Sequence, residues 1–307
     1  MKIWQILIAI VVLILIVGGG YLYTQVRALE VEQLSDDLWV LRGFGGNTAV
    51  LKTRAGTVVV DTMTFGIQGD HIRETARELT GMPTAMIINT HYHLDHTHGN
   101  PAFEPGTRVL STERTLQYLH TVDGDFWQGG AAELMPNETF SDRQTLFVGT
   151  KKIELVHPGP GHTDGDLVVI FVDEGVAHLG DLFFNGHYPN IDLEAGGTVQ
   201  AWPATLDNVL ALNFDRVIPG HGVTTDRNGL RAFQRFLQQL GDIGQQAAAE
   251  NWTLEQVRST AALTEDAGYE PIEFIVSLGL DRGFVLQRAW EETTGQFVRH
   301  LDAAGAD

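Results

Sequence analysis

The fold of this chain is indicated most clearly by the stretch HYHLDHTH at residues 91–98. It directly follows an apolar run, AMII at residues 85–88, that predicts a buried strand. The polar cluster therefore belongs to a loop at the carboxyl end of a strand, where open α/β sheets bind ligands. Three imidazoles and a carboxylate within six residues are typical of a metal site, and zinc is a usual ion for these ligands.

Four more polar residues follow predicted strands elsewhere in the chain. Asp61 ends an apolar strand predicted at residues 57–60. The other three, His162, Asp181 and His221, each have a glycine beside them, which allows a sharp turn that directs the side chain back over the sheet. The chain contains no cysteine, so disulfides and thiolate ligands are excluded.

These motifs, in this order, resemble those of the metallo-β-lactamase superfamily over roughly residues 35–225. The matching residues are Asp61, His91, His93, Asp95, His96, His162, Asp181 and His221. The resemblance implies an α/β fold, a four-layer αββα sandwich in which two mixed sheets lie between helices. Within the superfamily the set looks most like those of glyoxalase II, ribonuclease Z and the acyl-homoserine-lactone lactonases.

The resemblance also implies a centre with two metal ions, by default two zinc ions, although iron or manganese also suits such ligands. It assigns the ligands as follows: His91, His93 and His162 to one ion, Asp95, His96 and His221 to the other, and Asp181 to both. Two ions lower the pKa of a shared water and polarise a carbonyl or phosphoryl oxygen. We therefore expect a zinc-dependent hydrolase of a small ester, lactone, thioester or amide, with Asp95 and Asp181 as catalytic residues.

Other functions on the same scaffold stay open. Asp181 stands where some β-lactamases carry a zinc-bound cysteine, which disfavours β-lactamase activity without removing it as an alternative. A mononuclear iron oxidoreductase, similar to the persulfide dioxygenases, is a second alternative. A non-catalytic binding protein is a third. The complete ligand set favours hydrolysis over these last two.

The charge of the chain limits its partners. Acidic residues outnumber basic ones by 39 to 20, which gives a formal charge of −19, and lysines and arginines do not cluster. Nucleic-acid binders carry a basic face, so we expect a small-molecule substrate and no nucleic acid. The sequence does not indicate the oligomeric state.

Two segments are expected to border the substrate. Residues 121–138 show no periodicity, which is typical of a lid or binding loop. Within it, Phe126 and Trp127 either touch substrate or pack against the loop itself.

The second segment, residues 183–190, follows Asp181 directly. Tyr188 is the catalytic residue predicted here, because a phenol is protonated at neutral pH and can donate a hydrogen bond to an oxyanion. Asn185 and His187 are the alternatives for that role.

The amino-terminal end predicts a membrane segment. Residues 3–23 are long enough to span the hydrocarbon core, and Gln5 is their only strongly polar side chain. Lys2 precedes them, so the catalytic domain is expected outside the cell or in the periplasm, anchored by this helix. Cleavage of a signal peptide near residues 26–28 is the alternative and predicts a secreted protein.

These patterns divide the chain into four parts. They are a membrane anchor or signal segment at residues 1–24, a linker at 25–34, a metallo-β-lactamase-like catalytic domain at 35–226, and a helical part at 227–307 packed on the same domain. In the last part, Thr253 and Gln256 predict a capping box, and Gly295 predicts a weak point in the final helix.

Overall fold

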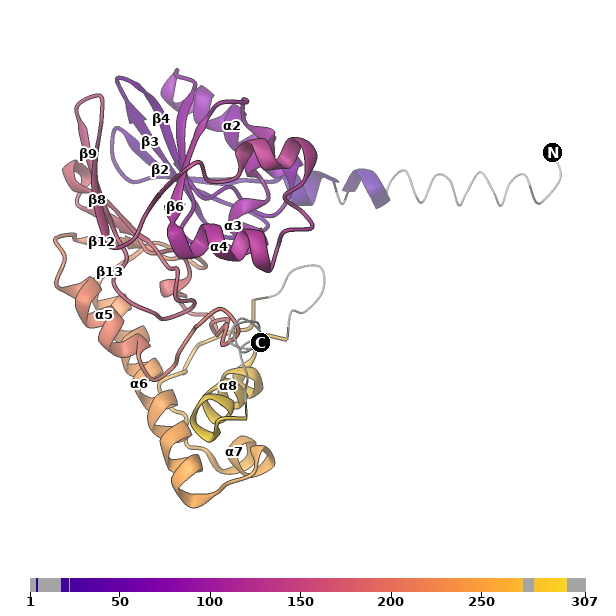
Figure 1. Cartoon of the computed structure of the whole chain (residues 1–307), viewed down its shortest axis with the longest axis vertical. Coiled ribbons are helices and arrows are strands. Elements are labelled where there is room, and N and C mark those ends of the chain that lie inside the picture. The colour runs from indigo at the N-terminus through magenta and orange to yellow at the C-terminus, as the bar shows by residue number, and fades with distance from the viewer. Residues whose placement is uncertain (1–3, 5–17, 22, 273–278, 297–307) are drawn as a thin grey trace, which may run out of the picture.

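The computed structural model describes residues 4, 18–21, 23–272 and 279–296. Two β-sheets pack face to face, and helices cover the outer face of each (Figure 1). The predicted four-layer α/β sandwich is therefore confirmed.

The first sheet has seven strands that follow one another in chain order. They are β1 (Glu30–Gln33), β2 (Leu38–Arg42), β3 (Thr48–Thr53), β4 (Gly56–Val60), β5 (Thr84–Ile88), β6 (Arg108–Thr112) and β7 (Glu138–Phe140). Strands β1 to β4 pair antiparallel, whereas β4 to β7 pair parallel. Since β4 and β5 are parallel neighbours, Asp61 and the loop at residues 91–98 leave the sheet at the same edge.

The second sheet has six strands in the order β13-β12-β11-β10-β9-β8. They are β8 (Arg143–Val148), β9 (Lys151–Val156), β10 (Val168–Phe171), β11 (Val176–His178), β12 (Arg216–Ile218) and β13 (Thr225–Asp226). The single parallel pair, β11 with β12, brings the segments that carry Asp181 and His221 together.

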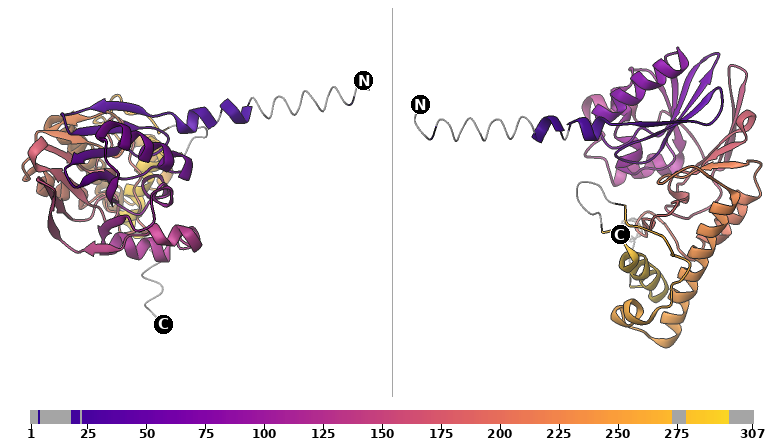
Figure 2. Two further views of the ribbon diagram at one scale, coloured as in Figure 1. Left: turned by 90° about the horizontal axis from the view of Figure 1, so that it is seen from above. Right: turned by 180° about the vertical axis from the view of Figure 1, so that it is seen from behind.

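Helices cover both sheets. On the first sheet they are α2 (Gly66–Thr80), the single turn α3 (Leu94–Thr97) and α4 (Glu113–Thr121), and on the second α5 (Trp202–Leu210) and α6 (Arg227–Glu250). Two further helices, α7 (Leu254–Thr260) and α8 (Arg282–Thr294), follow α6. The 24 residues of α6 make a helix about 36 Å long. It extends beyond the sandwich, and α7 and α8 lie alongside its far half (Figure 2).

Among the described residues, the three largest apolar clusters hold the layers together. Side chains from both sheets, among them Val58 and Phe171, fill the space between the sheets. A second core lies under α2. The third joins the second sheet to α5, α6 and α8 around Trp202 and Phe233, so the carboxyl-terminal helices share a core with the sandwich.

Of two local signals predicted at helices, one acts as expected and the other differs. Thr253 and Gln256 form the capping box of α7, each side chain bonding the backbone of the other residue. Gly295 adopts a left-handed conformation with φ of 68° and ends α8 rather than weakening its interior.

The fold predicted from the sequence needs correction at its amino-terminal end. Within the part of the chain that the structure describes, none of the helices combines the length and the apolar character needed to cross a membrane. The predicted transmembrane helix therefore has no counterpart among the described helices, and most of residues 3–23, where it was predicted, lies outside the described residues.

The predicted linker at residues 25–34 is also partly wrong. Residues 30–33 form the edge strand β1, which pairs with β2. Its sequence, EVEQ, has no apolar pattern, because the strand is mostly exposed. Arg42 of β2 holds it through ion pairs with Glu30 and Glu32.

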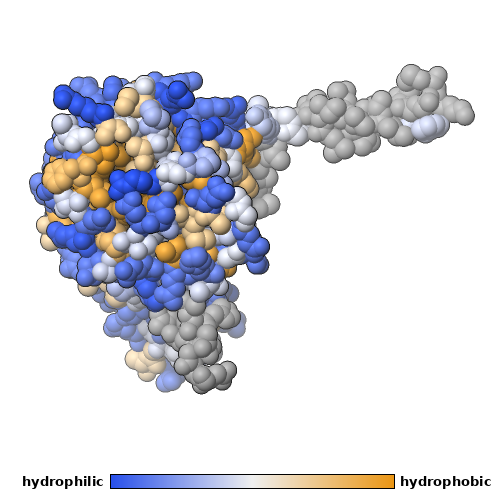
Figure 3. Space-filling model, turned by 45° about the horizontal axis from the view of Figure 1, so that its top comes forward, coloured by the Kyte–Doolittle hydropathy of each residue, from blue (hydrophilic) through white to orange (hydrophobic). Residues whose placement is uncertain are grey.

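The surface is largely hydrophilic. The face seen in Figure 3 mixes hydrophilic side chains with several apolar patches, as on most globular proteins. Phe147 on β8 is one exposed apolar side chain, with 72% of its surface accessible.

Phe171 and Phe147 provide a test of this core. Phe171 is fully buried between the sheets, so Phe171→Ala should lower the free energy of unfolding by about 3–5 kcal/mol. The exposed Phe147→Ala is the matched control and should change it by less than about 0.5 kcal/mol. Denaturant unfolding followed by circular dichroism measures both, and equal losses would contradict the layer assignment.

Candidate metal centre

All seven residues predicted as metal ligands come together at one edge of the two sheets. The structure places them in two groups, His91, His93, His162 and Asp181 in the first, and Asp95, His96 and His221 in the second. Within each group the candidate ligand atoms lie within 4.8 Å of one another. The crowded loop at residues 91–98 supplies both groups, with His91 and His93 in the first and Asp95 and His96 in the second.

Asp181 lies between the two groups. Its Oδ2 atom is 3.8 Å from Nε2 of His91 and 3.6 Å from Nε2 of His162. Its Oδ1 atom is 3.1 Å from Nε2 of His96 and 3.5 Å from Nε2 of His221. One carboxylate therefore presents a different oxygen to each group.

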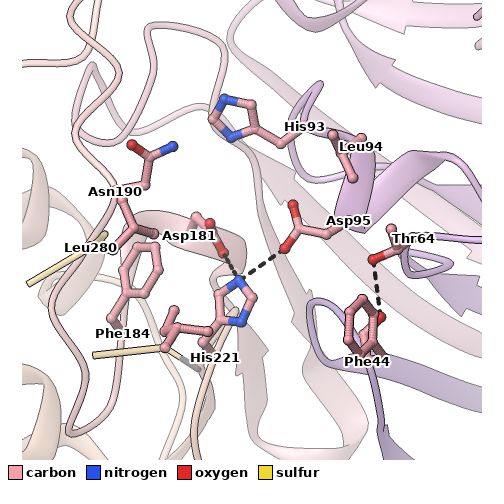
Figure 4. A pocket seen from close by; sticks show the side chains of 11 residues that line it. Phe44, Thr64, His93, Leu94, Asp95, Asp181, Phe184, Asn190, His221 and Leu280 are labelled. Atoms are coloured by element: carbon pink, nitrogen blue, oxygen red, sulfur yellow. Dashed lines mark hydrogen bonds and ion pairs between the residues drawn. The ribbon is translucent and has the colours of Figure 1, made fainter. Parts of the chain in front are cut away.

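Contacts within each group are equally close. In the first, Nδ1 of His93 lies 2.8 Å from Nε2 of His162. In the second, Oδ2 of Asp95 lies 3.2 Å from Nε2 of His221 and 3.6 Å from Nε2 of His96. Figure 4 shows Asp95, Asp181 and His221 directed toward one another.

Several of these buried atoms have no hydrogen-bond partner among the described residues. They are Nε2 of His91, Nε2 of His96 and Oδ1 of Asp181. Buried polar atoms are nearly always paired, so bare imidazole nitrogens that face a carboxylate indicate a bound cation. Imidazole and carboxylate ligands fit zinc, and iron or manganese as well.

The other ring nitrogens are fixed by the surrounding structure. Nδ1 of His96 lies 2.7 Å from Oδ2 of Asp61, and Nδ1 of His162 lies 2.8 Å from the carbonyl oxygen of Asn190. An acceptor at one ring nitrogen holds the proton there and leaves the other nitrogen free as a metal ligand. Both rings are thus oriented toward the centre before any metal binds.

Asp61 serves the centre by orienting its loop. Its carboxylate is completely buried and accepts hydrogen bonds from the backbone N–H and the hydroxyl of Thr90, at 2.8 and 2.7 Å. Its backbone has φ of 60°, a conformation that costs free energy for a residue other than glycine. These contacts hold the loop that carries the candidate ligands.

Two glycines are required by close approach to ligands. A Cβ at Gly220 would lie 2.0 Å from Oδ1 of Asp181, and one at Gly46 would lie 2.1 Å from the His96 ring. Any side chain at either position would displace a candidate ligand.

Burial and neighbouring charges give the histidines different pKa values in the metal-free chain. Burial, with the ring of His96 nearby, holds the pKa of His91 well below its ordinary value. Burial acts on His221 too, but the carboxylates of Asp181 and Asp95 outweigh it and raise its pKa to about 9. His91 is therefore neutral and ready to bind a cation at pH 7, whereas His221 must first lose a proton.

A cavity of about 280 Å³ opens onto the candidate ligands. It is reached by His93, Asp95, Asp181 and His221, and its remaining described walls are Phe44, Thr64, Leu94, Phe184, Asn190, Ile272 and Leu280. Most of these side chains are apolar, and Figure 4 shows them around the two carboxylates.

The catalytic role predicted for Tyr188 has no support in this arrangement. Tyr188 is buried, and its hydroxyl donates a 2.8 Å hydrogen bond to Asp266. The alternatives are also engaged, since the Asn185 amide donates to the carbonyl of Val223 and the His187 ring contacts the backbone of Glu270. None of the three is among the described residues that line the cavity.

Residues 121–138 are ordered by their own packing and by the ligand loop. The Phe126 ring stacks on His98 at 3.5 Å between centroids. Asp123 accepts hydrogen bonds from His98 and from the indole of Trp127, both at 2.8 Å. Neither aromatic is among the described lining residues. The two rings pack against each other at 5.0 Å between centroids, as one alternative predicted, and Phe126 also packs against the ligand loop.

Asp192 is a residue of the site that sequence reasoning missed. Its Oδ2 atom lies 3.0 Å from Nε2 of His93 and accepts a hydrogen bond from the hydroxyl of Tyr92. Burial disfavours a charged Asp192, but the His93 ring outweighs that effect and holds the pKa of Asp192 far below its ordinary value. No motif marks it, because it belongs to an irregular segment far from His93 in the sequence.

Comparison with known proteins identifies relatives of this architecture. The family model described as the metallo-beta-lactamase superfamily matches residues 41–221. The 2,4-dinitroanisole O-demethylase subunit alpha of Nocardioides sp. is 25% identical over 63% of this chain, and the match spans 58% of that protein. The metallo-beta-lactamase type 2 of Bacillus sp. is 28% identical over 65% of this chain and 78% of its own length.

Solved structures show the same fold. A metallo-beta-lactamase from Pontibacter korlensis superposes with a TM-score of 0.61, covers 69% of this chain and 99% of its own, and is 22% identical. The DIM-1 metallo-beta-lactamase superposes with a TM-score of 0.59 over 68% of this chain and 97% of its own, at 20% identity.

Asp192→Asn tests how His93 is held. Removing the charge from the acceptor of Nε2 should weaken metal binding by about 10–100-fold, as found for partners of metal-bound histidines. Competition with a chelating dye measures the affinity. The exposed Asp242→Asn is the control, and an unchanged affinity in Asp192→Asn would show that the contact does not orient His93.

Metal binding should also release protons at pH 7. Because His221 has a pKa of about 9 in the metal-free chain, it keeps its proton below that pH and must lose it to bind a cation. Metal affinity should therefore rise with pH up to about 9. Calorimetric titration in two buffers of different ionisation enthalpy counts the protons, and identical heats in both buffers would contradict the assignment.

Proposed function

The chain belongs to the metallo-beta-lactamase superfamily, and we propose that it is a hydrolase with a dinuclear zinc centre that cleaves a small ester, lactone, thioester or amide. The observation that carries this proposal is the position of Asp181, whose two oxygens face two separate groups of histidines. That arrangement supports two ions joined by one carboxylate.

The residues proposed to hold the ions follow the two groups. His91, His93 and His162 would bind the first ion, and Asp95, His96 and His221 the second, with Asp181 shared. When bound, two such ions lower the pKa of a water and polarise the bond to be cleaved. Zinc is proposed because all the donors are imidazole nitrogens and carboxylate oxygens.

The side chains around the cavity support hydrolysis in other ways. Asp95 lines the cavity with 22% of its side chain exposed, and Oδ2 is the oxygen that faces His96 and His221. Its other oxygen is proposed to accept a hydrogen bond from the attacking water and to receive its proton. Phe184 and Ile272 shield the reacting atoms from bulk solvent.

Hydrolysis of a β-lactam is the second candidate. The observation in its favour is that the Bacillus relatives and two of the superposed structures are named metallo-beta-lactamases. The cavity disfavours this reaction, because none of its described lining residues is a lysine or an arginine that could pair with a substrate carboxylate.

Asp181→Asn should separate these proposals from an oxidoreductase with a single iron. Protein purified without chelator should contain about two zinc ions per chain, and the variant should bind fewer and lose at least about 100-fold in kcat/KM. Elemental analysis and hydrolysis of ester, lactone, thioester and β-lactam substrates provide the measurements.

The exposed Asp125→Asn is the matched control, which should keep both the zinc and the activity. One iron per chain with no hydrolysis of any substrate would refute the proposed function. Full activity in Asp181→Asn would refute the bridging role.

A further inference from the structure

We propose that the substrate is an electrically neutral molecule that places an apolar group, about the size of one aromatic ring with a short chain, in the cavity beside Asp95 and Asp181. This inference deepens the proposed hydrolytic function and rests on it. It follows from the composition, the size and the charges of the cavity walls.

The walls present carbon to a ligand. Phe184 is 1% exposed and stacks against the His221 ring, with centroids 5.3 Å apart and planes at 13°, so its position is fixed. Ile272 and Leu280 add two aliphatic side chains to the cavity walls. Burying apolar ligand surface against such walls contributes about 25 cal/mol per Å².

The mouth of the cavity continues this apolar surface. Leu94, between two candidate ligands, is 50% exposed and lines the cavity. Phe44 lines it as well and stacks on Phe65, which is 43% exposed, at 5.7 Å. Large exposed apolar side chains that gather at a site mark a surface that binds apolar groups.

The volume limits the size of the ligand. The cavity measures about 280 Å³, whereas a protein cavity of roughly 150 Å³ accommodates benzene. Drug-sized ligands occupy pockets of about 300–1,000 Å³, so this cavity lies just below that range. A ring with a short chain therefore fits.

The described walls contain no counterion for a remote anionic group. None of the described lining residues is a lysine or an arginine. Of the neutral polar ones, the Thr64 hydroxyl donates its hydrogen to the backbone of Phe44, and Asn190 has only an amide to offer. A substrate carboxylate away from the reacting bond would lose its hydration without gaining an ion pair, which costs several kcal/mol.

The adjoining groove does not supply a cation either. It shares Phe44, His221 and Ile272 with the cavity and contains Arg42. Arg42 is engaged by the carboxylates of Glu30 and Glu32. The formal charge of −19 adds a long-range repulsion of anions. Penicillins and cephalosporins carry a carboxylate, so they are poor candidates on these grounds.

Two esters with one leaving group test the inference. The metal-loaded enzyme should cleave 4-nitrophenyl butyrate with kcat/KM at least about 100-fold higher than mono(4-nitrophenyl) succinate, equivalent to about 2.7 kcal/mol. Leu280→Lys, which adds a cation to the wall, should reduce this ratio at least about tenfold. Phe147→Lys, which adds the same charge at an exposed position of β8 that does not line the cavity, is the control and should keep it.

A binding measurement separates this inference from the proposed function. Calorimetry with 4-phenylbutan-2-one and its 4-carboxyphenyl analogue should show tighter binding of the neutral ketone. If neither ester is cleaved but the neutral ketone binds preferentially, ester hydrolysis is refuted and the inference about the cavity holds. If both esters are cleaved equally well, the inference is overturned while hydrolysis stands. Equal binding of the ketones without hydrolysis would refute both.

Discussion

The structure depends on one electrostatic arrangement, a buried carboxylate held between two sets of imidazoles. Asp181 is 4% exposed, and its oxygens lie 3.1–3.8 Å from nitrogens of His91, His96, His162 and His221. Buried imidazoles this close together repel one another when they are protonated. When they are neutral, some of their ring nitrogens have no hydrogen-bond partner among the described residues. A divalent cation on each side of the carboxylate satisfies both sets of atoms at once, and much of the nearby sequence is explained by the need to hold these groups in place.

The sandwich provides that support by bringing strand ends together. Parallel pairing of β4 with β5 places Asp61 beside the His91–His98 loop, and parallel pairing of β11 with β12 places Asp181 beside His221. Glycine at position 220 permits the contact between the last two segments, because a Cβ there would overlap the Asp181 carboxylate. The apolar core between the sheets keeps the two halves of the site at a fixed separation. Small errors in packing would therefore change the site directly.

The family resemblance predicted the layers and the ligand set, and strong local signals carry that resemblance. Apolar runs mark buried strands such as β5 and β10, and polar residues that follow such runs mark the site. The edge strand β1 escaped prediction because its exposed EVEQ sequence carries no apolar periodicity. Asp192 escaped because its contact with His93 spans 99 residues of chain. Tyr188 was chosen for its chemistry and its nearness to Asp181 in sequence, but tertiary packing commits its hydroxyl to Asp266.

The central claim is that Asp181 joins two metal ions. A crystal structure of the protein purified without chelator, with anomalous scattering measured on both sides of the zinc absorption edge, tests it most directly. Two zinc peaks roughly 3.5–4 Å apart, one on each side of the Asp181 carboxylate, are the predicted result. A single peak next to His91, His93 and His162, with Asp95, His96 and His221 bonded only to protein or water, would contradict it.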